Sequence, residues 1–188
     1  MEPLGHLVVV VPGIGGSVLE GPDGGAGYGQ GLRQLAASVG WPERLSLAEH
    51  PQLRPVGLLS TMAVIPPLLV VPGYDGLVRQ IENNFHRVRV DVSRPGQDPD
   101  LGADLVLFPY DFRLSVADAA RRLAAVVCAR LAGLSAQARR RRVIVVAHSM
   151  GGLVARYWLG PLGGAPYCRA LVTVGTPHRG APKALDWL

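Results

Sequence analysis

The sequence predicts one α/β domain, a mostly parallel sheet with flanking helices, and three observations support this. Apolar, β-branched runs recur along the chain. Segments with helical spacing separate the later runs, and such alternation is typical of parallel sheets. The 188 residues also have the length of a single domain with its own hydrophobic core.

Four apolar runs are expected to form strands. Each is a nearly continuous stretch of Val, Ile and Leu, which is typical of strands buried on both faces. The first run, "HLVVVVPG", ends at Pro-Gly, a strong turn signal. The four expected strands cover residues 6–13, 104–111, 142–149 and 169–177.

The best helical pattern covers residues 115–134. Ser115 with Asp118 three residues later resembles a capping box in which Asp replaces Glu. Cys128 falls within the apolar pattern, and we expect it in the core. The apolar stripe consists of Val116, Ala120, Leu123, Val127 and Leu131. The arginines expected off that stripe are Arg121, Arg122 and Arg130.

Residues 18–67 differ from the rest of the chain. They contain glycine-rich turns, scattered prolines and only a short helical pattern near 31–39. We expect this segment to be an excursion from the sheet, a small cap or lid within a single domain of residues 1–188.

Charge and cysteine content exclude several function classes. The net charge of +5 comes almost entirely from arginine, and its dense cluster, Arg139–Arg142, directly precedes a buried strand. We interpret the cluster as a solvated helix end, not as a nucleic-acid or membrane patch, because no aromatic–basic interleaving accompanies it. The two cysteines make neither a disulfide framework nor a metal site, and no cofactor is expected.

The chain also lacks the signals of secretion or membrane insertion. The first strand-like run begins within a few residues of Met1, which leaves no room for a signal peptide. No apolar stretch reaches the ~18 residues that a membrane span needs. We therefore expect a cytoplasmic protein with no integral membrane segment, for which transient contact with a lipid surface remains open.

The stretch "VIVVAHSMGG" contains the residues that indicate a catalytic function. The pattern G-x-S-x-G marks a sharp strand-to-helix turn that exposes a nucleophilic serine. Here the turn runs from Ala147 to Gly151, with Ser149 at its centre and alanine in place of the first glycine. A helix should begin near Ser149 and end near Gly160. We expect His148 to point away from the serine and to serve in packing.

A nucleophilic serine also needs backbone N–H donors for the oxyanion. One should come from Met150, at the positive end of the following helix. The other should come from Ile14, in the glycine-rich loop after the first strand. That loop does not complete a dinucleotide-binding G-x-G-x-x-G pattern, since Val18 occupies the last position.

Five stretches occur in this order along the chain: "VVVVPGIGGSVLE", "VVPGYDGLVRQIE", "FPYDFR", "VVAHSMGGLVARYWL" and "VTVGTPHRGAPKAL". Together they resemble motifs of the lecithin:cholesterol acyltransferase-like family of α/β-hydrolases. The resemblance implies an α/β-hydrolase-type sheet and acyl transfer from a lipid or other ester substrate, as an O-acyltransferase or a lipase/esterase, with Ser149 as nucleophile. It further implies that Ile14 and Met150 hold the oxyanion.

The resemblance also assigns a role to the "YDFR" element. Its residues Tyr110, Asp111 and Arg113 are expected to form an internal hydrogen-bonded brace behind the site. The family's paired lid cysteines have no counterpart in residues 18–67, so the lid is expected to be shorter and unstapled. Acceptor preference therefore does not carry over.

The Asp or Glu and the His that should complete a triad with Ser149 are not assigned by these motifs. Triad order in this fold is Ser, then Asp or Glu, then His, whereas here His178 precedes Asp186. His178 is a weak candidate base, because "GTPHRG" is typical of a structural turn. We expect the domain to be truncated after the strand that follows the nucleophile helix, with the Asp and His lying beyond Leu188. The alternative is a catalytically incomplete fragment or a non-enzymatic module that binds acyl ligands.

Overall fold

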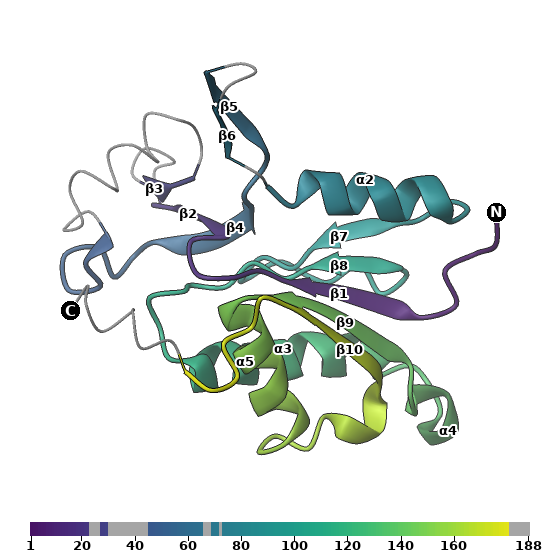
Figure 1. Cartoon of the computed structure of the whole chain (residues 1–188). Coiled ribbons are helices and arrows are strands. Elements are labelled where there is room, and N and C mark those ends of the chain that lie inside the picture. The colour runs from purple at the N-terminus through teal and green to yellow at the C-terminus, as the bar shows by residue number, and fades with distance from the viewer. Residues whose placement is uncertain (23–26, 30–44, 66–68, 72, 181–188) are drawn as a thin grey trace.

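The computed structural model describes residues 1–22, 27–29, 45–65, 69–71 and 73–180 (Figure 1). Its centre is a five-stranded sheet in the order β10-β9-β1-β8-β7, in which every neighbouring pair is parallel. The predicted fold class and all four predicted strands are confirmed, and β7 is an additional strand. The strands are β1 (Leu7–Val11), β7 (Val90–Val92), β8 (Leu105–Leu107), β9 (Val143–His148) and β10 (Cys168–Val174).

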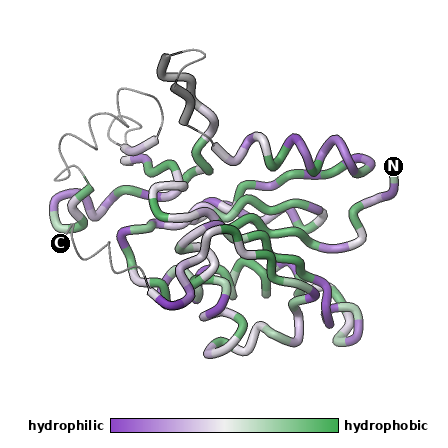
Figure 2. Tube along the Cα trace, in the orientation of Figure 1, coloured by the Kyte–Doolittle hydropathy of each residue, from purple (hydrophilic) through white to green (hydrophobic). Residues whose placement is uncertain are grey.

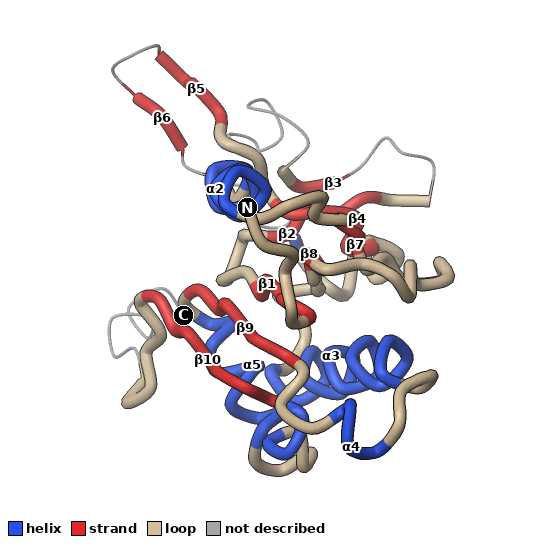
Figure 3. Tube along the Cα trace, turned by 90° about the vertical axis from the view of Figure 1, so that its right-hand side faces the viewer, coloured by secondary structure: helices blue, strands red, loops and turns tan. Residues whose placement is uncertain are grey.

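Helices lie on both faces of this sheet (Figures 1 and 3). One face carries α3 and α5, which are the two predicted helices, and the other carries α2. The Ser115 hydroxyl accepts a hydrogen bond from the Asp118 amide at 3.1 Å, which confirms the predicted cap. The helices are α2 (Asp75–Asn84), α3 (Val116–Leu131), α4 (Ala136–Arg139) and α5 (Met150–Leu159), with a 3-10 turn at Ala165–Tyr167.

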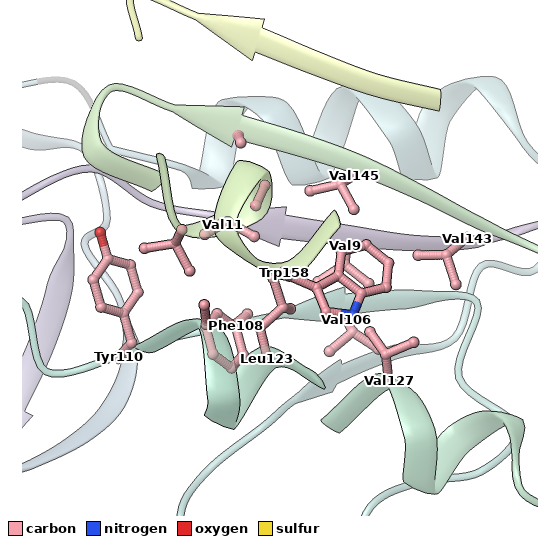
Figure 4. Close-up of a cluster of buried hydrophobic side chains, with 14 of the residues drawn as sticks. Val9, Val11, Val106, Phe108, Tyr110, Leu123, Val127, Val143, Val145 and Trp158 are labelled. Atoms are coloured by element: carbon pink, nitrogen blue, oxygen red, sulfur yellow. The ribbon is translucent and has the colours of Figure 1, made fainter. Parts of the chain in front are cut away.

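The main hydrophobic core lies between the sheet and the α3–α5 pair. All five residues of β1 are buried, as expected of a central strand in a parallel sheet. Figure 2 shows the central strands as hydrophobic and much of α2 as hydrophilic. Figure 4 shows the largest side chains of the core, which are Phe108, Tyr110, Leu123 and Trp158, with valines of the strands around them.

Helix α3 departs from two sequence-based expectations. Cys128 is exposed, not part of the core, because it lies one residue, and so 100° of rotation, beyond the buried Val127. Arg130 was expected off the apolar stripe, yet it is buried and pairs with Asp91 of β7. It follows Val127 by three residues and therefore faces the sheet. Burying its charge requires the carboxylate partner.

The arginine cluster begins at Arg139, the last residue of the short helix α4. The Arg139 guanidinium donates to the carbonyl oxygens of Leu134 and Ala132, at 2.8 and 2.6 Å. The three arginines after it are exposed. These positions fit the solvated helix end that the sequence indicates.

The segment between β1 and α2 forms structure apart from the central sheet. A three-stranded antiparallel sheet contains β2 (Ser17–Glu20), β3 (Gly27–Tyr28) and β4 (Arg54–Leu58), and a hairpin contains β5 (Met62–Ile65) and β6 (Leu69–Val71). The hairpin projects away from the central sheet in both views (Figures 1 and 3). The helical pattern predicted near 31–39 lies outside the described residues.

The order of the strands places a crevice beside β1. After β1 the chain adds β7 and β8 on one side, and then crosses through α3 to add β9 and β10 on the other. The loops that leave the carboxyl ends of β1 and β9 therefore diverge, and ligands of open α/β sheets bind at such switch points. The loop after β1 and Ser149 after β9 both lie there.

Candidate active site

Ser149 occupies a strained turn between a strand and a helix. Strand β9 ends at His148 and α5 begins at Met150. Between them Ser149 has φ 50° and ψ −124°, a conformation that side-chain-bearing residues rarely adopt and that costs about 1–3 kcal/mol. Its amide donates to the Val174 carbonyl oxygen at 2.8 Å, so the end of β10 holds the turn. This is the local geometry that presents a side chain at the top of a sheet.

Two glycines allow the turn to lie against the loop after β1. A Cβ atom on Gly151 would lie 2.4 Å from the Pro12 carbonyl oxygen. A Cβ atom on Gly13 would lie 2.9 Å from the Ser149 Cβ. Neither position has room for a side chain, so the loop and the turn at Ser149 are in direct contact.

The two expected oxyanion donors flank this contact. Met150 is the first residue of α5, where backbone N–H groups have no intrahelical acceptor. Ile14 lies in the loop after β1 and is 68% exposed. Within the described part of the chain, neither amide donates a hydrogen bond to another protein group.

Tyr74, which sequence reasoning left without a role, connects the two segments. It precedes α2, and its hydroxyl lies 2.9 Å from the Gly13 amide nitrogen and 2.9 Å from His148 Nδ1. Burial raises the pKa of Tyr74, and the hydrogen bond from Gly13 partly opposes that rise. His148, which was expected to serve in packing, is exposed and is also hydrogen-bonded to Tyr74.

A cavity of about 370 Å³ opens beside these residues. The size is at the lower end of the range for small-molecule sites. Its walls are mostly aliphatic, and Tyr74 and His148 are the lining residues with polar side chains. The lining residues are Val10, Val11, Ile14, Gly15, Gly16, Leu59, Gly73, Tyr74, Leu77, Val146, Ala147, His148 and Val174.

Tyr110 supports the loop after β1 through a hydrogen bond. Its hydroxyl donates to the Pro12 carbonyl oxygen at 3.0 Å, and its amide donates to Ser17 Oγ at 2.9 Å. Both side chains are buried, and burial raises the pKa of Tyr110, so the phenol stays protonated. The loop is therefore tied to the end of β8.

Asp111 and Arg113 form a buried ion pair next to Tyr110. The guanidinium donates to Asp111 through Nε at 2.8 Å and through a terminal nitrogen at 2.7 Å, and the two side chains are only 8% and 6% exposed. The other terminal nitrogen donates to the His50 carbonyl oxygen at 2.9 Å. The pair thus ties residues after β8 to the segment between β3 and β4.

His178 forms no hydrogen bond with Ser149 in the described part of the chain. Its Nε2 is 3.5 Å from Thr173 Oγ1, and its ring is exposed. Among the described residues no histidine forms a hydrogen bond with Ser149. Asp186 lies outside the described residues. Nor do the described residues gather three or more His, Cys, Asp or Glu side chains around a point that could hold a metal ion.

Comparison with known protein families gives a match over the second half of the chain. The family model of lecithin:cholesterol acyltransferase matches residues 93–188, which is more than half of the chain and includes β8, α3, β9, Ser149, α5 and β10. A search of curated proteins finds no match. No helix in the described ranges combines the length and apolarity needed to cross a bilayer. The chain therefore belongs to the lecithin:cholesterol acyltransferase family, whose general function is acyl transfer or lipase-like chemistry on lipid substrates.

Proposed function

We propose that Ser149 is the nucleophile of an acyl-transfer reaction on a lipid or other ester. The Ser149 oxygen attacks the ester carbonyl carbon while its proton passes to a general base. The tetrahedral oxyanion is then stabilised by the Ile14 and Met150 N–H groups. Its collapse breaks the bond to the alcohol, which leaves with the proton, and the acyl-enzyme passes its acyl group to water or to an acceptor alcohol.

One observation carries the proposal. A serine held at φ 50° and ψ −124° between a buried strand and a helix N-terminus stores strain that a capping serine would not need. The Ser149 side chain also makes no cap hydrogen bond to the helix, which leaves its oxygen available. Both features favour a nucleophile over a simple N-cap.

The cavity supplies a place for the acyl group. Its walls include Val10, Leu77 and Val146, which offer aliphatic contacts, and it reaches His148 next to the nucleophile. Burial of methylene groups there would contribute about 0.8 kcal/mol each. We propose that the acyl chain lies in this cavity, and that residues 18–67 form the cap over it.

The remaining roles are supporting ones. We propose that Tyr110, Asp111 and Arg113 brace the oxyanion loop, since their contacts reach Pro12 and the His50 carbonyl. The base is proposed to come from residues outside the described part of the chain, as the order of the triad in sequence indicates. A cytoplasmic location stays a prediction.

The experiment is labelling of the 188-residue chain by a fluorophosphonate, beside its Ser149→Ala and His178→Ala variants. Circular dichroism of each sample must show the same folded state. We expect Ser149→Ala to abolish labelling of a reactive wild type, whereas His178→Ala should retain it. Labelling that survives Ser149→Ala would overturn the proposal, and labelling lost in both variants would identify His178 as the base.

A second function is favoured by the absence of a histidine bonded to Ser149 among the described residues. The same cavity would serve a module that binds acyl ligands without turning them over. Binding of a fluorescent fatty acid that is unchanged in Ser149→Ala, together with a folded wild type that never labels, would support this alternative.

A further inference from the structure

The Tyr74 hydroxyl joins two backbone segments that are far apart in the sequence. Gly13 lies 61 residues before it, in the loop after β1, and His148 lies 74 residues after it, at the end of β9. Each of the two hydrogen bonds spans 2.9 Å. The neighbours of these residues are Ile14 and Ser149, so one phenol contacts both sides of the site.

The direction of the hydrogen bonds follows from the chemistry of the donors. An amide N–H can only donate, so the Tyr74 oxygen accepts from Gly13. The hydroxyl hydrogen is then free to be donated to His148 Nδ1, which in neutral histidine places the ring proton on Nε2. The result is a chain from the Gly13 amide through the phenol to the imidazole, whose two bonds polarise each other.

The packing leaves little freedom around this chain. A Cβ atom on Gly16 would lie 2.7 Å from the Tyr74 hydroxyl, and one on Gly13 would lie 3.1 Å from His148 Nδ1. The Tyr74 and His148 rings also meet edge to face, with centroids 6.0 Å apart. Movement of the phenol would therefore move the loop.

We infer that Tyr74 is a positioning residue, whose hydrogen bonds to Gly13 and His148 fix the spacing between the Ile14 and Met150 N–H groups. This inference rests on the proposed function, because those two groups matter only if an oxyanion forms between them. Oxyanion donors act at 2.7–3.1 Å from the oxygen, as a general rule, so a small shift of the loop weakens one of them.

The bridge is first tested without any reaction. In Tyr74→Phe, NMR should show about tenfold faster hydrogen exchange at the Gly13 amide, the factor expected for losing one typical hydrogen bond. The ¹⁵N shifts of His148 should report the Nε2–H tautomer in the wild type and a change in the variant. Tyr157→Phe, which removes a hydroxyl from a partly buried tyrosine of α5, is the matched control. Unchanged Gly13 exchange and His148 shifts in Tyr74→Phe would overturn the bridge.

Turnover then tests the positioning role, with p-nitrophenyl butyrate as the probe. We expect Tyr74→Phe to lower kcat about tenfold and to leave KM within about twofold, because the interaction acts on the transition state. His148→Asn keeps an acceptor near the position of Nδ1 and should retain most of kcat, whereas His148→Ala should not. An unchanged kcat in Tyr74→Phe would overturn the inference even where the Gly13 amide exchanges faster.

The two proposals fail separately. If Ser149→Ala leaves labelling or turnover intact, the proposed nucleophile is wrong, and the positioning role falls with it. The NMR result still decides whether the bridge exists. If Ser149→Ala abolishes turnover and Tyr74→Phe does not affect it, only the inference on Tyr74 is wrong.

Discussion

The two faces of the central sheet are covered to different extents. On the face that α3 and α5 cover, large side chains such as Phe108, Leu123 and Trp158 are almost fully buried (Figure 4). On the opposite face α2 contributes no buried residue. Near the end of β10, Val172 and Val174 are 48% and 55% exposed.

This difference separates stability from the site. The cavity beside Ser149 is lined by Val10, Leu77 and Val146, which belong to the less covered face. A close-packed interior has few voids larger than a water molecule, so room for a ligand is found where α2 covers the sheet incompletely. Packing on the other face stabilises the strands, and the site lies at the ends of these strands.

The largest expected effect tests this division. Trp158→Ala on the α5 face should lower the free energy of unfolding by about 3–5 kcal/mol, because it removes a buried aromatic side chain and leaves a cavity. Leu77→Ala on the α2 face should cost only about 1 kcal/mol, since Leu77 is half-buried. Urea denaturation followed by circular dichroism measures both. Equal losses would show that the two faces contribute equally.

The same contrast explains which elements could be predicted from the sequence. The strands of the sheet are apolar, β-branched runs, and α3 begins at a recognisable cap, so local pattern was sufficient. Helix α2 carries only three apolar residues toward the sheet, Leu77, Val78 and Ile81. Strand β7 is three residues long with Asp91 in its centre. Signals this weak do not stand out from loops.

The residues of the site also differ in how well the sequence predicts them. Ser149 and its turn follow from a local motif, since strand, serine and helix are contiguous. The bond from Tyr74 to His148 and the ion pair between Asp91 and Arg130 join residues 74 and 39 positions apart. No local periodicity reports such contacts, because they depend on how the strands are ordered. The Pro-Gly-Tyr-Asp stretch, which ends at the first residue of α2, was the sequence signal available for Tyr74.

Gly151, in the turn after Ser149, should tolerate a side chain less well than the open position of Gly133. Gly151→Ala brings a Cβ against the Pro12 carbonyl oxygen, and we expect a net loss of about 1–2 kcal/mol despite the better helix propensity of alanine. Fluorophosphonate labelling should slow as well, because the loop with Ile14 must shift. Gly133→Ala is the control, as nothing lies within 4 Å of its Cβ position. Equal stability of the two variants would mean that the contact at Pro12 is loose.

The smallest expected effect lies at the start of α2, where polar contacts near solvent hold the less covered face. Hydrogen bonds from the Thr61 hydroxyl and amide, at 2.6 and 2.8 Å, lower the pKa of Asp75 from 3.8 to about 2, and Arg79 contributes further. The folded-state pKa lies below the unfolded value, so this stabilisation is present above about pH 4 and is lost as the pH falls toward 2.

Asp75→Asn should therefore cost less than about 1 kcal/mol at pH 6, since the carboxylate is in contact with water. The difference from wild type should shrink between pH 4 and pH 2, whereas Glu82→Gln, an exposed carboxylate of the same helix, should match wild type throughout. A difference that stays constant with pH would mean that the shape of the side chain, not its charge, holds the start of α2.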